Sequence, residues 1–343
     1  MKVGLKNLLS RKEFLVIAVF FFLLLFLFYF IFFTPNYYEG KSPVQFEITK
    51  GESFSDVVDS LYEKGIIHSK TNMEIAGFIY GAETKVRAAR FTIPNGLSYL
   101  GLLDLFINGN AEFKKTVNIR DGLSIKWMAY ILKREADIDS ANFVNLAFNK
   151  NFVDSLGINK PSLEGYLMPG TYEFYAKTPA REVIGKLYNS FWEFMNDSLR
   201  ARAKSIGLTV HKVVTLASII KGETSSPEDM PRISGVYHNR LRIGMLLQAD
   251  PTVQYLLKDG WRRLLDKDLR INSPYNTYRY AGLPPGPINN PGKDAILAAL
   301  YPEDNNYLYF VADGKGGHRF SSTYSQHLKN VNEYRKWLKS QNN

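Results

Sequence analysis

The chain has 343 residues, a hydrophobic content of 45% and a formal net charge of +10. This length allows two or three domains with cores of their own. The chain has no Cys, which excludes disulfides and thiolate metal sites. A basic chain can bind nucleic acid, anionic lipid or an anionic polymer. No RNA-reading motif, zinc-finger spacing or long Lys/Arg block is present, so we do not expect nucleic acid as a partner.

A basic N-terminus precedes a long apolar run. The run from Phe14 to Phe33 has 20 residues without a charge, which is enough to span a membrane at about 1.5 Å per residue. Residues 1–13 carry four Lys/Arg and one Glu, which predicts a cytoplasmic N-terminus and places residues 34–343 outside the cytoplasmic membrane. A cleaved signal peptide is the alternative, but the run is long for one and no Ala-x-Ala-like site follows. We therefore expect a single-pass anchor.

One short pattern, Ile-x-x-Gly-x-Ser, occurs three times in residues 44–135. Its copies start at Ile48, Ile93 and Ile119. Each copy follows a β-like run and precedes apolar residues at helical spacing. The Gly suits a tight turn and the Ser suits a helix N-cap, and Asp56 completes a capping-box pattern with Ser53. We expect strand–turn–helix units in a small α+β region that follows a linker at residues 34–43.

The first of these units, FEITKGESFSDVVDSLYEKGII, resembles a LysM-like glycan-binding module. Ordinary turn chemistry between a strand and a helix explains each copy equally well. Glycan binding by this region therefore stays open. The unequal spacing of the copies excludes a solenoid.

The helix expected from His211 to Thr224 carries one carboxylate, Glu223, at its end. Glu223 comes three residues after Ile220 and seven after Leu216, so it shares their apolar face. A carboxyl at this position is partly desolvated, which raises its pKa, and a general acid at neutral pH needs such a shift. A Glu at a helix end is more often a solvated charge, so this pattern alone makes Glu223 only a candidate.

A second helix is expected to start at Pro227 and end at Gly244. Tyr237 falls on its core-facing side, whereas Asn239 and Arg240 fall on another side, where they can reach polar partners. The run SPYNTYRYAGLPPGPINNPG follows and is rich in Pro and Gly. Such a loop has little entropy left to lose and can wall a groove. Its hydroxyls, amide and aromatic faces suit a sugar ring, although an ordinary ordered loop explains them too.

No metal or cofactor is expected. His238, His318 and His327 are not at a metal-ligand spacing, and the chain has neither Cys nor an HExxH motif. The GKGGH run lacks the spacing of a phosphate-binding loop.

Six segments resemble those of the YceG-like family, the endolytic murein transglycosylases of the bacterial inner membrane. They are EGYLMPGTYEF, ASIIKGET, VYHNRL, GMLLQADPTVQY, YNTYRYAGLPPGPINNPG and YLYFVADGKGGHRF. The resemblance covers nearly the whole chain. It implies an α+β fold with one N-terminal transmembrane helix, a LysM-like α+β subdomain, and an α+β catalytic domain over residues 136–343 with its core at 207–330. The topology of residues 207–343 is not readable from the pattern.

The resemblance also implies that Glu223 is the catalytic residue. The family's usual pattern just before that Glu is Glu-Lys, whereas this chain has Lys221-Gly222, which exchanges an acid for a cation. Lys221 could lower the pKa of Glu223 somewhat, although residues i and i+2 point apart on a helix. The residues expected to bind the sugar are Gln248, Asp250, Tyr275, Asn276, Thr277 and His318.

The activity implied is lytic cleavage of the bond between N-acetylmuramic acid and N-acetylglucosamine in nascent glycan strands. It leaves a 1,6-anhydromuramyl end and terminates strand elongation. The implied partners are peptidoglycan glycan strands, the inner membrane through Phe14–Phe33, and peptidoglycan synthases. Two alternatives stay open: a hydrolytic muramidase that uses Asp250 as a second carboxylate, and a non-catalytic glycan-binding scaffold for wall-synthesis proteins.

Overall fold

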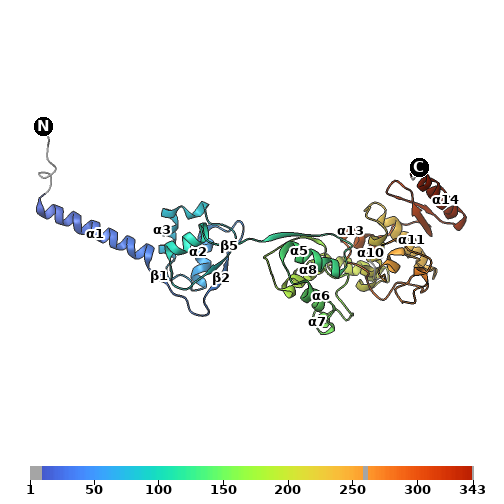
Figure 1. Cartoon of the computed structure of the whole chain (residues 1–343), viewed down its shortest axis with the longest axis horizontal. Coiled ribbons are helices and arrows are strands. Elements are labelled where there is room, and N and C mark those ends of the chain that lie inside the picture. Colours follow the sequence, from blue (N-terminus) through green and yellow to red (C-terminus); the bar gives the residue numbers. More distant parts are fainter. Residues whose placement is uncertain (1–9, 258–261, 342–343) are drawn as a thin grey trace. The chain divides into compact units, whose positions relative to one another are not determined.

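The computed structural model describes residues 10–257 and 262–341 and has a mixed α+β fold. The chain divides into two compact units, Met1–Lys114 (unit 1) and Lys115–Asn343 (unit 2) (Figure 1). Each unit has a hydrophobic core of its own. The cores are therefore considered separately.

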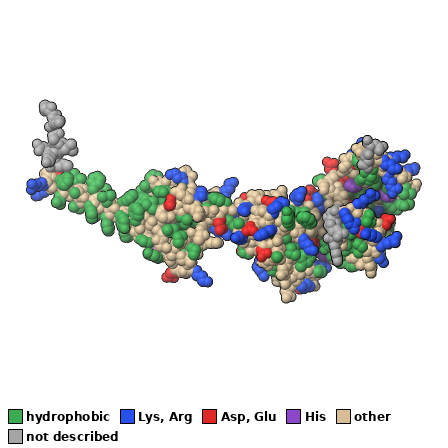
Figure 2. All heavy atoms as spheres, in the orientation of Figure 1, with side chains coloured by type: hydrophobic (Ala, Val, Ile, Leu, Met, Phe, Trp, Pro, Cys, Tyr) green, Lys and Arg blue, Asp and Glu red, His purple; other side chains and the backbone are tan. Residues whose placement is uncertain are grey.

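Unit 1 begins with the apolar helix α1 (Arg11–Phe33). A capping box starts it, because the Ser10 side chain accepts from the Glu13 backbone N–H and the Glu13 carboxylate accepts from the Ser10 N–H. The helix has the length and composition of a membrane span, and its side chains form a continuous apolar surface (Figure 2). Its last turn differs, since Phe32 is buried in the core of unit 1.

Short antiparallel strands and three helices make up the rest of unit 1. One sheet has the order β2-β3-β5 and a second pairs β1 with β4. The strands are β1 (Pro35–Asn36), β2 (Val44–Glu47), β3 (Arg90–Ile93), β4 (Leu97–Ser98) and β5 (Ala111–Glu112). The helices are α2 (Phe54–Glu63), α3 (Lys70–Tyr80) and α4 (Tyr99–Ile107), with a 3-10 turn, η2 (Ala82–Thr84). Phe46, Phe91 and Phe106 pack against one another at the centre.

The segment expected as a linker, residues 34–43, is instead part of the fold of unit 1. Strand β1 pairs with β4, and Tyr38 is buried with its hydroxyl donating to the carbonyl of Ile93 at 2.7 Å. The chain therefore passes from α1 into the folded unit without an extended connection.

The three strand–turn–helix units predicted from the repeated pattern are confirmed. Their glycines, Gly51, Gly96 and Gly122, have φ of +90°, +82° and +81°, which only glycine adopts readily. Ser53 and Ser98 cap the following helices α2 and α4 with their side chains. The third helix, α5 (Ile125–Ala136), is capped differently, by a carboxylate from a distant segment.

The third strand–turn–helix repeat belongs to unit 2. The chain therefore divides after Lys114, whereas the sequence pattern placed the end of this region at residue 135. The reason is a strand pair, because β6 (Lys115–Ile119) pairs antiparallel with β7 (Gly170–Phe174). Helix α5 packs in the same core. A repeat in the sequence thus crosses the boundary between units.

Helices build most of unit 2. After α5 come α6 (Ser140–Phe148), α7 (Lys150–Ser155), α8 (Ala180–Phe194) and α9 (Asp197–Ser205). Helices α8 and α9 are separate, and the Asn196 side chain caps the start of α9. The buried helix α10 (Val210–Glu223) packs on α11 (Met230–Arg242), α12 (Asp250–Gln254) and α13 (Lys293–Leu300). A 3-10 turn η3 (Asp268–Arg270), the hairpin β8 (Tyr309–Ala312) and β9 (His318–Ser321), and α14 (Tyr324–Gln341) complete the unit.

Candidate active site

Helix α10 fixes the position of Glu223. Thr209 caps its start by accepting from the Lys212 backbone N–H. Eight consecutive residues, 213–220, are buried, so the helix is surrounded by protein on all sides. Glu223 is the last residue of the helix and is only partly exposed. The sequence pattern predicted this location of Glu223, at the end of the helix and on its apolar face.

The Glu223 carboxyl accepts one hydrogen bond, from the Tyr237 hydroxyl to Oε1 at 2.6 Å. Burial raises the pKa of Glu223 to about 7; the bond from Tyr237 opposes the rise, the negative charge of Asp250 adds to it, and the Arg240 cation opposes it. A carboxyl with this pKa can both give and take a proton near neutrality.

Tyr237 was assigned to the core by its spacing, and the structure shows that its hydroxyl also bonds the Glu223 carboxyl. Its side chain is 1% exposed and its ring packs edge-on against Phe310, with centroids 5.9 Å apart. Burial and the charge of Glu223 raise the pKa of Tyr237 well above its ordinary value, so its hydroxyl stays a donor. One chemical rule, that a buried tyrosine needs a hydrogen-bond partner for its hydroxyl, was not used in the prediction from the sequence.

The next residues of the VYHNRL segment hold neighbouring parts of unit 2 in place. His238 Nε2 lies 3.0 Å from the carbonyl oxygen of Ala299. Asn239 Nδ2 donates to the carbonyls of Asn305 and Tyr307 at 2.9 and 3.0 Å. The expectation that Asn239 reaches polar partners is confirmed, and those partners precede strand β8.

Arg240 places a buried positive charge close to the site. Its side chain donates to the carbonyls of Leu308 and Leu247 at 2.7 and 2.6 Å, and its guanidinium lies over the Tyr309 ring at 5.5 Å. Burial lowers the pKa of Arg240, and its charge acts to lower the pKa of Glu223. The ionised form of Glu223 thus has one hydrogen-bond donor and one cation to stabilise it.

A second carboxylate, Asp250, lies at the start of α12. The Tyr278 hydroxyl donates to Asp250 Oδ1. Two residues earlier, Gln248 has an exposed side chain and a φ of +49°, an uncommon conformation for a residue other than glycine. Such backbone strain is found often at functional sites. Gln248 and Asp250 therefore both have exposed polar side chains, and Asp250 lies close enough to Glu223 to raise its pKa.

Asn276 lies inside the loop that follows. It is fully buried, and its Nδ2 donates to the carbonyls of Leu269 and Ile271 at 2.9 and 2.8 Å. Its Oδ1 accepts from the Tyr278 backbone N–H at 3.0 Å. These bonds lie within the loop and hold Tyr278 in place.

Thr277 is likewise buried and bonded to its neighbours. Its Oγ1 accepts from the Ala249 backbone N–H at 2.9 Å and shares a hydrogen bond with the Thr252 hydroxyl. The Thr277 carbonyl accepts from the Gln248 backbone N–H at 3.1 Å. The Tyr275 ring is half-buried beside Tyr255, with centroids 5.1 Å apart. Asn276 and Thr277 thus position the residues around them, and direct contact with sugar is not their evident role.

His318 lies one layer behind Tyr237. Its Nδ1 is 2.8 Å from Asp229 Oδ2, and its ring meets Phe310 edge-on with centroids 5.5 Å apart. Phe310 also packs against Tyr237. His318 is therefore related to Glu223 through two intervening aromatic residues.

The other histidines have separate surroundings. His238 lies beside a helix carbonyl, and the His327 ring stacks on Tyr309 with centroids 5.2 Å apart. Within residues 10–257 and 262–341, no three His, Asp or Glu side chains gather as metal ligands would.

The Lys221-Gly222 pair has distinct partners. Lys221 Nζ forms an ion pair with Asp121 Oδ2 at 2.9 Å, with only 11% of the Lys221 side chain exposed. Gly222 packs against α12 so closely that an added Cβ would lie 2.5 Å from Pro251 Cβ. The lysine charge is thus engaged by the turn before α5, and the glycine permits close approach of the segment that carries Asp250.

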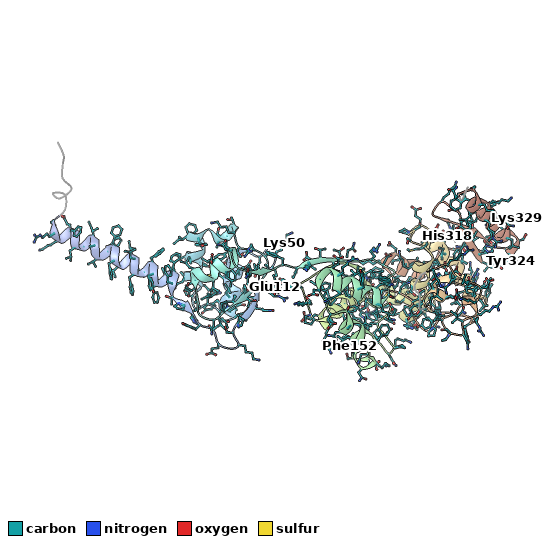
Figure 3. All side chains as sticks on the ribbon, viewed as in Figure 1. Lys50, Glu112, Phe152, His318, Tyr324 and Lys329 are labelled. Carbon is teal, nitrogen blue, oxygen red and sulfur yellow. The ribbon has the colours of Figure 1, made fainter. Side chains whose placement is uncertain are left out.

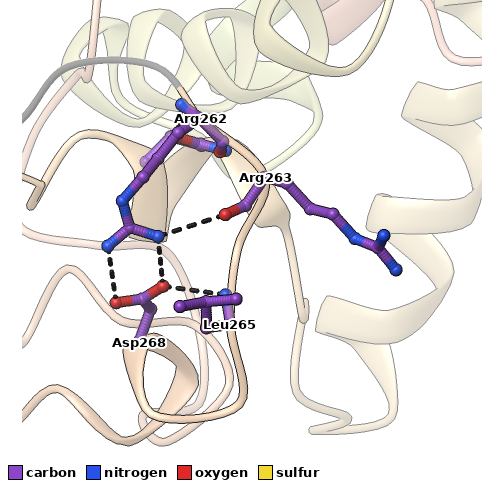
Figure 4. A network of polar contacts seen from close by, with 5 residues as sticks. Arg262, Arg263, Leu265 and Asp268 are labelled. Carbon is purple, nitrogen blue, oxygen red and sulfur yellow. Dashed lines mark hydrogen bonds and ion pairs between the residues drawn. The ribbon is translucent and has the colours of Figure 1, made fainter.

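A polar network at the other end of α12 fixes that short helix (Figure 4). Arg262 donates to both carboxylate oxygens of Asp268, at 2.7 and 3.0 Å, and the Leu265 backbone N–H donates to the same carboxylate. The bonds from Arg262 hold the pKa of Asp268 down, at about 2. The Gln254 amide donates to the Arg262 carbonyl, which joins the end of α12 to this network. Both ends of α12 are therefore held.

A model of the YceG-like family matches residues 46–333. The chain belongs to the YceG-like family. The resemblance seen in the sequence is therefore confirmed, and the matched residues include Glu223 and every other candidate site residue.

Three members of the family are informative. The endolytic murein transglycosylase of Bacillus subtilis (strain 168) is 30% identical over 311 residues, which cover 86% of each chain. That of Streptococcus pneumoniae serotype 2 (strain D39) is 29% identical over 258 residues, 72% of this chain and 44% of the longer protein. The crystal structure of a YceG-like protein from Listeria monocytogenes has 29% identity and a TM-score of 0.59, and the match covers 84% of this chain and 99% of that one.

Proposed function

We propose that this YceG-like chain is an endolytic murein transglycosylase, with Glu223 as its only acid and base. The observation that carries the proposal is the partly buried Glu223 carboxyl, whose pKa is raised to about 7 by burial. The names of the two bacterial relatives at about 30% identity support the same reaction class.

In the first step, Glu223 protonates the oxygen that joins C1 of N-acetylmuramic acid to N-acetylglucosamine. The bond from C1 to that oxygen breaks, and positive charge develops on the muramyl ring. Glu223 becomes a carboxylate, which the Tyr237 hydroxyl and the Arg240 cation stabilise. Because these two groups stabilise the negative charge that develops on Glu223, they lower the barrier to its proton transfer.

In the second step, the Glu223 carboxylate takes the proton from the C6 hydroxyl of the same muramyl ring. The C6 oxygen forms a bond to C1, which gives the 1,6-anhydro product and consumes no water. Glu223 ends the cycle protonated, as it began. One carboxyl is sufficient, unlike the pair used by most glycosidases.

The sugar contacts that we propose come mainly from expected site residues whose polar side chains have accessible surface. Gln248 and Asp250 have exposed side chains, and that of Tyr275 is partly exposed. His318 is a weaker candidate, because only 13% of its side chain is exposed and it packs behind Phe310. Asn276 and Thr277 act through the loop, where they position Tyr278 and the backbone of Gln248. Tyr237 joins the set as the residue bonded to the acid.

The second candidate is a hydrolytic muramidase, and Asp250 is the feature that favours it. Its charge contributes to the raised pKa of Glu223, so the two carboxylates interact. In a hydrolase, Asp250 would activate water or attack the sugar, and the product would have a reducing end. The third candidate, a non-catalytic scaffold, would not depend on Glu223.

We also propose that α1 anchors the protein in the inner membrane, with a cytoplasmic N-terminus and unit 2 outside the cytoplasm. Its apolar length and the cations Arg11 and Lys12 support this topology. Nascent glycan strands are made at that membrane, so an anchored enzyme stays within reach of them. Peptidoglycan synthases are the partners that this location suggests.

Mass spectrometry of products decides among the three candidates. The purified full chain in detergent is incubated with peptidoglycan, beside Glu223→Gln and the control Glu228→Gln, which changes an exposed carboxylate on the following segment. We expect anhydro-ended fragments from the wild type and the control, and a loss of roughly 10³-fold in Glu223→Gln. Reducing ends would indicate a hydrolase. If neither the wild type nor Glu228→Gln released products, the scaffold would be favoured.

A further inference from the structure

Helix α3 carries an exposed apolar patch, Ile75, Phe78 and Ile79, which are 38%, 78% and 57% exposed. The opposite face of the helix is buried, with Met73 and Ala76 in the core. The three patch residues line a groove of about 590 Å³ that also includes Phe54 at the start of α2. Clustered exposed apolar side chains of this size usually mark a binding surface.

The place of α3 in unit 1 points to what covers the patch. Helix α3 packs directly against α1, and Figure 1 shows it beside the end of α1. The last turn of α1 is fixed in the core of the same unit through Phe32. If α1 spans a membrane, as proposed above, unit 1 meets the lipid surface where α1 ends.

Two further features fit a lipid surface. Tyr29 and Tyr37, near the end of α1, are 64% and 65% exposed, and tyrosines gather where a membrane span leaves the hydrocarbon. The α3 patch is also held rigidly, because the Phe54 ring lies so near Gly77 that an added Cβ would be 2.1 Å from it. The patch is therefore a preformed surface.

We infer that the α3 patch inserts into the lipid surface on the side of the membrane where α1 ends. The helix would lie in the interface with its apolar face towards the acyl chains. The groove is also lined by Glu74 and Glu83, so the attraction is apolar and should not require anionic lipid. This inference rests on the proposed membrane span but does not depend on the catalytic role of Glu223.

Single-cysteine labelling tests the inference, since the chain has no Cys. An environment-sensitive fluorophore is attached to Phe78→Cys or Ile79→Cys in the full chain reconstituted in phosphatidylcholine vesicles. Lys50→Cys is the aqueous control; Lys50 is exposed and lies on the side of unit 1 away from the end of α1 in Figure 3. Phe22→Cys is the membrane control.

We expect a spin-labelled lipid to quench the probe at Phe78→Cys and Ile79→Cys at least threefold more than at Lys50→Cys, while iodide in water quenches it less. The result should persist when anionic lipid is added. Equal quenching by the lipid at Phe78→Cys and Lys50→Cys would overturn the inference. If the lipid still quenched the probe at Phe22→Cys, the proposal that α1 spans the membrane would be unaffected. A probe at Phe22→Cys that iodide reaches would overturn both. A requirement for anionic lipid would refute the apolar basis.

Discussion

At the scale of single residues, the proposed chemistry depends on three neighbours of Glu223 that shift its pKa in different directions. Burial raises the pKa of Glu223, Tyr237 and Arg240 act against the rise, and Asp250 adds to it. The pKa of Glu223 is thereby held near 7, between the protonated form that the proposed mechanism needs first and the ionised form that it needs midway. Each neighbour can be tested by the direction in which its removal shifts the pKa of Glu223.

The dependence of kcat/KM on pH should follow Glu223. If Glu223 is the general acid, it must be protonated in the free protein, so kcat/KM should fall above a pKa of about 7. Tyr237→Phe removes a bond that lowers the pKa of Glu223, so the fall should move to higher pH. Asp250→Asn removes a charge that raises it, so the fall should move to lower pH. Initial rates of anhydro-product release across the pH range measure both shifts.

Asp250→Asn also separates the two enzyme mechanisms. If Asp250 only adjusts the pKa of Glu223 and contacts the sugar, the variant should lose activity by about 10-fold at most and still form anhydro ends. A complete loss of product, with the fold intact by circular dichroism, would contradict the single-carboxyl mechanism.

Glu223→Gln should stabilise the protein while it removes activity. The pKa of Glu223 is about 7 in the folded state and near 4.5 in the unfolded chain, so the folded state binds more protons between these values. Stability therefore falls as the pH rises through that window. Above pH 7 the glutamine variant avoids a penalty of up to about 3 kcal/mol, whereas below pH 4.5 it should gain nothing. Urea unfolding of the wild type and Glu223→Gln above pH 7 and below pH 4.5 tests this. An equal gain in stability at the two pH values would contradict it.

At the scale of elements, the site is made where α10, α11 and α12 meet. Their positions depend on close contacts, such as that of Gly222 with Pro251, and on polar bonds at both ends of α12. The ion pair of Lys221 with Asp121 joins α10 to the turn before α5. These contacts place the acid relative to Asp250.

Gly222→Ala tests the contact between α10 and α12. The new methyl group would lie 2.5 Å from Pro251 Cβ, so the two helices must separate, at a cost of about 1–3 kcal/mol. The matched control is Gly185→Ala in α8, where an added Cβ meets nothing within 4 Å and should change stability by about 1 kcal/mol or less, in the favourable direction. Thermal unfolding compares the two, and equal effects would show that the contact has no energetic role.

The sequence was sufficient for features that depend on local chemistry. The turn glycines, the Ser caps of α2 and α4, and the location of Glu223 at a helix end followed from spacing and propensity. It was not sufficient where a distant segment decides the outcome. Glu164 caps α5 from 39 residues away, and strand pairing with β7 moves the third repeat into unit 2. The bond from Tyr237 to Glu223 is of the same long-range kind.

At the scale of the whole molecule, two separate cores predict two separate unfolding events. Leu103 is fully buried in unit 1 and Leu216 is fully buried in unit 2. Substituting either with Ala should cost about 2–5 kcal/mol, and the loss should stay within the unit that carries it. Hydrogen exchange followed by mass spectrometry on the detergent-solubilised chain reports each unit. Equal deprotection of both units by one substitution would contradict two independent cores.

The burial of Phe32 also bears on the proposed membrane anchor, because it ties α1 to the core of unit 1. A peptidase that cut the chain after α1 would remove a core side chain together with the helix. Losing a buried Phe costs about 3–5 kcal/mol, a large share of the 5–15 kcal/mol that typically holds a domain together. Shedding at this joint would therefore loosen unit 1 itself. The buried side chain of Phe32 therefore favours retention of α1 as part of unit 1.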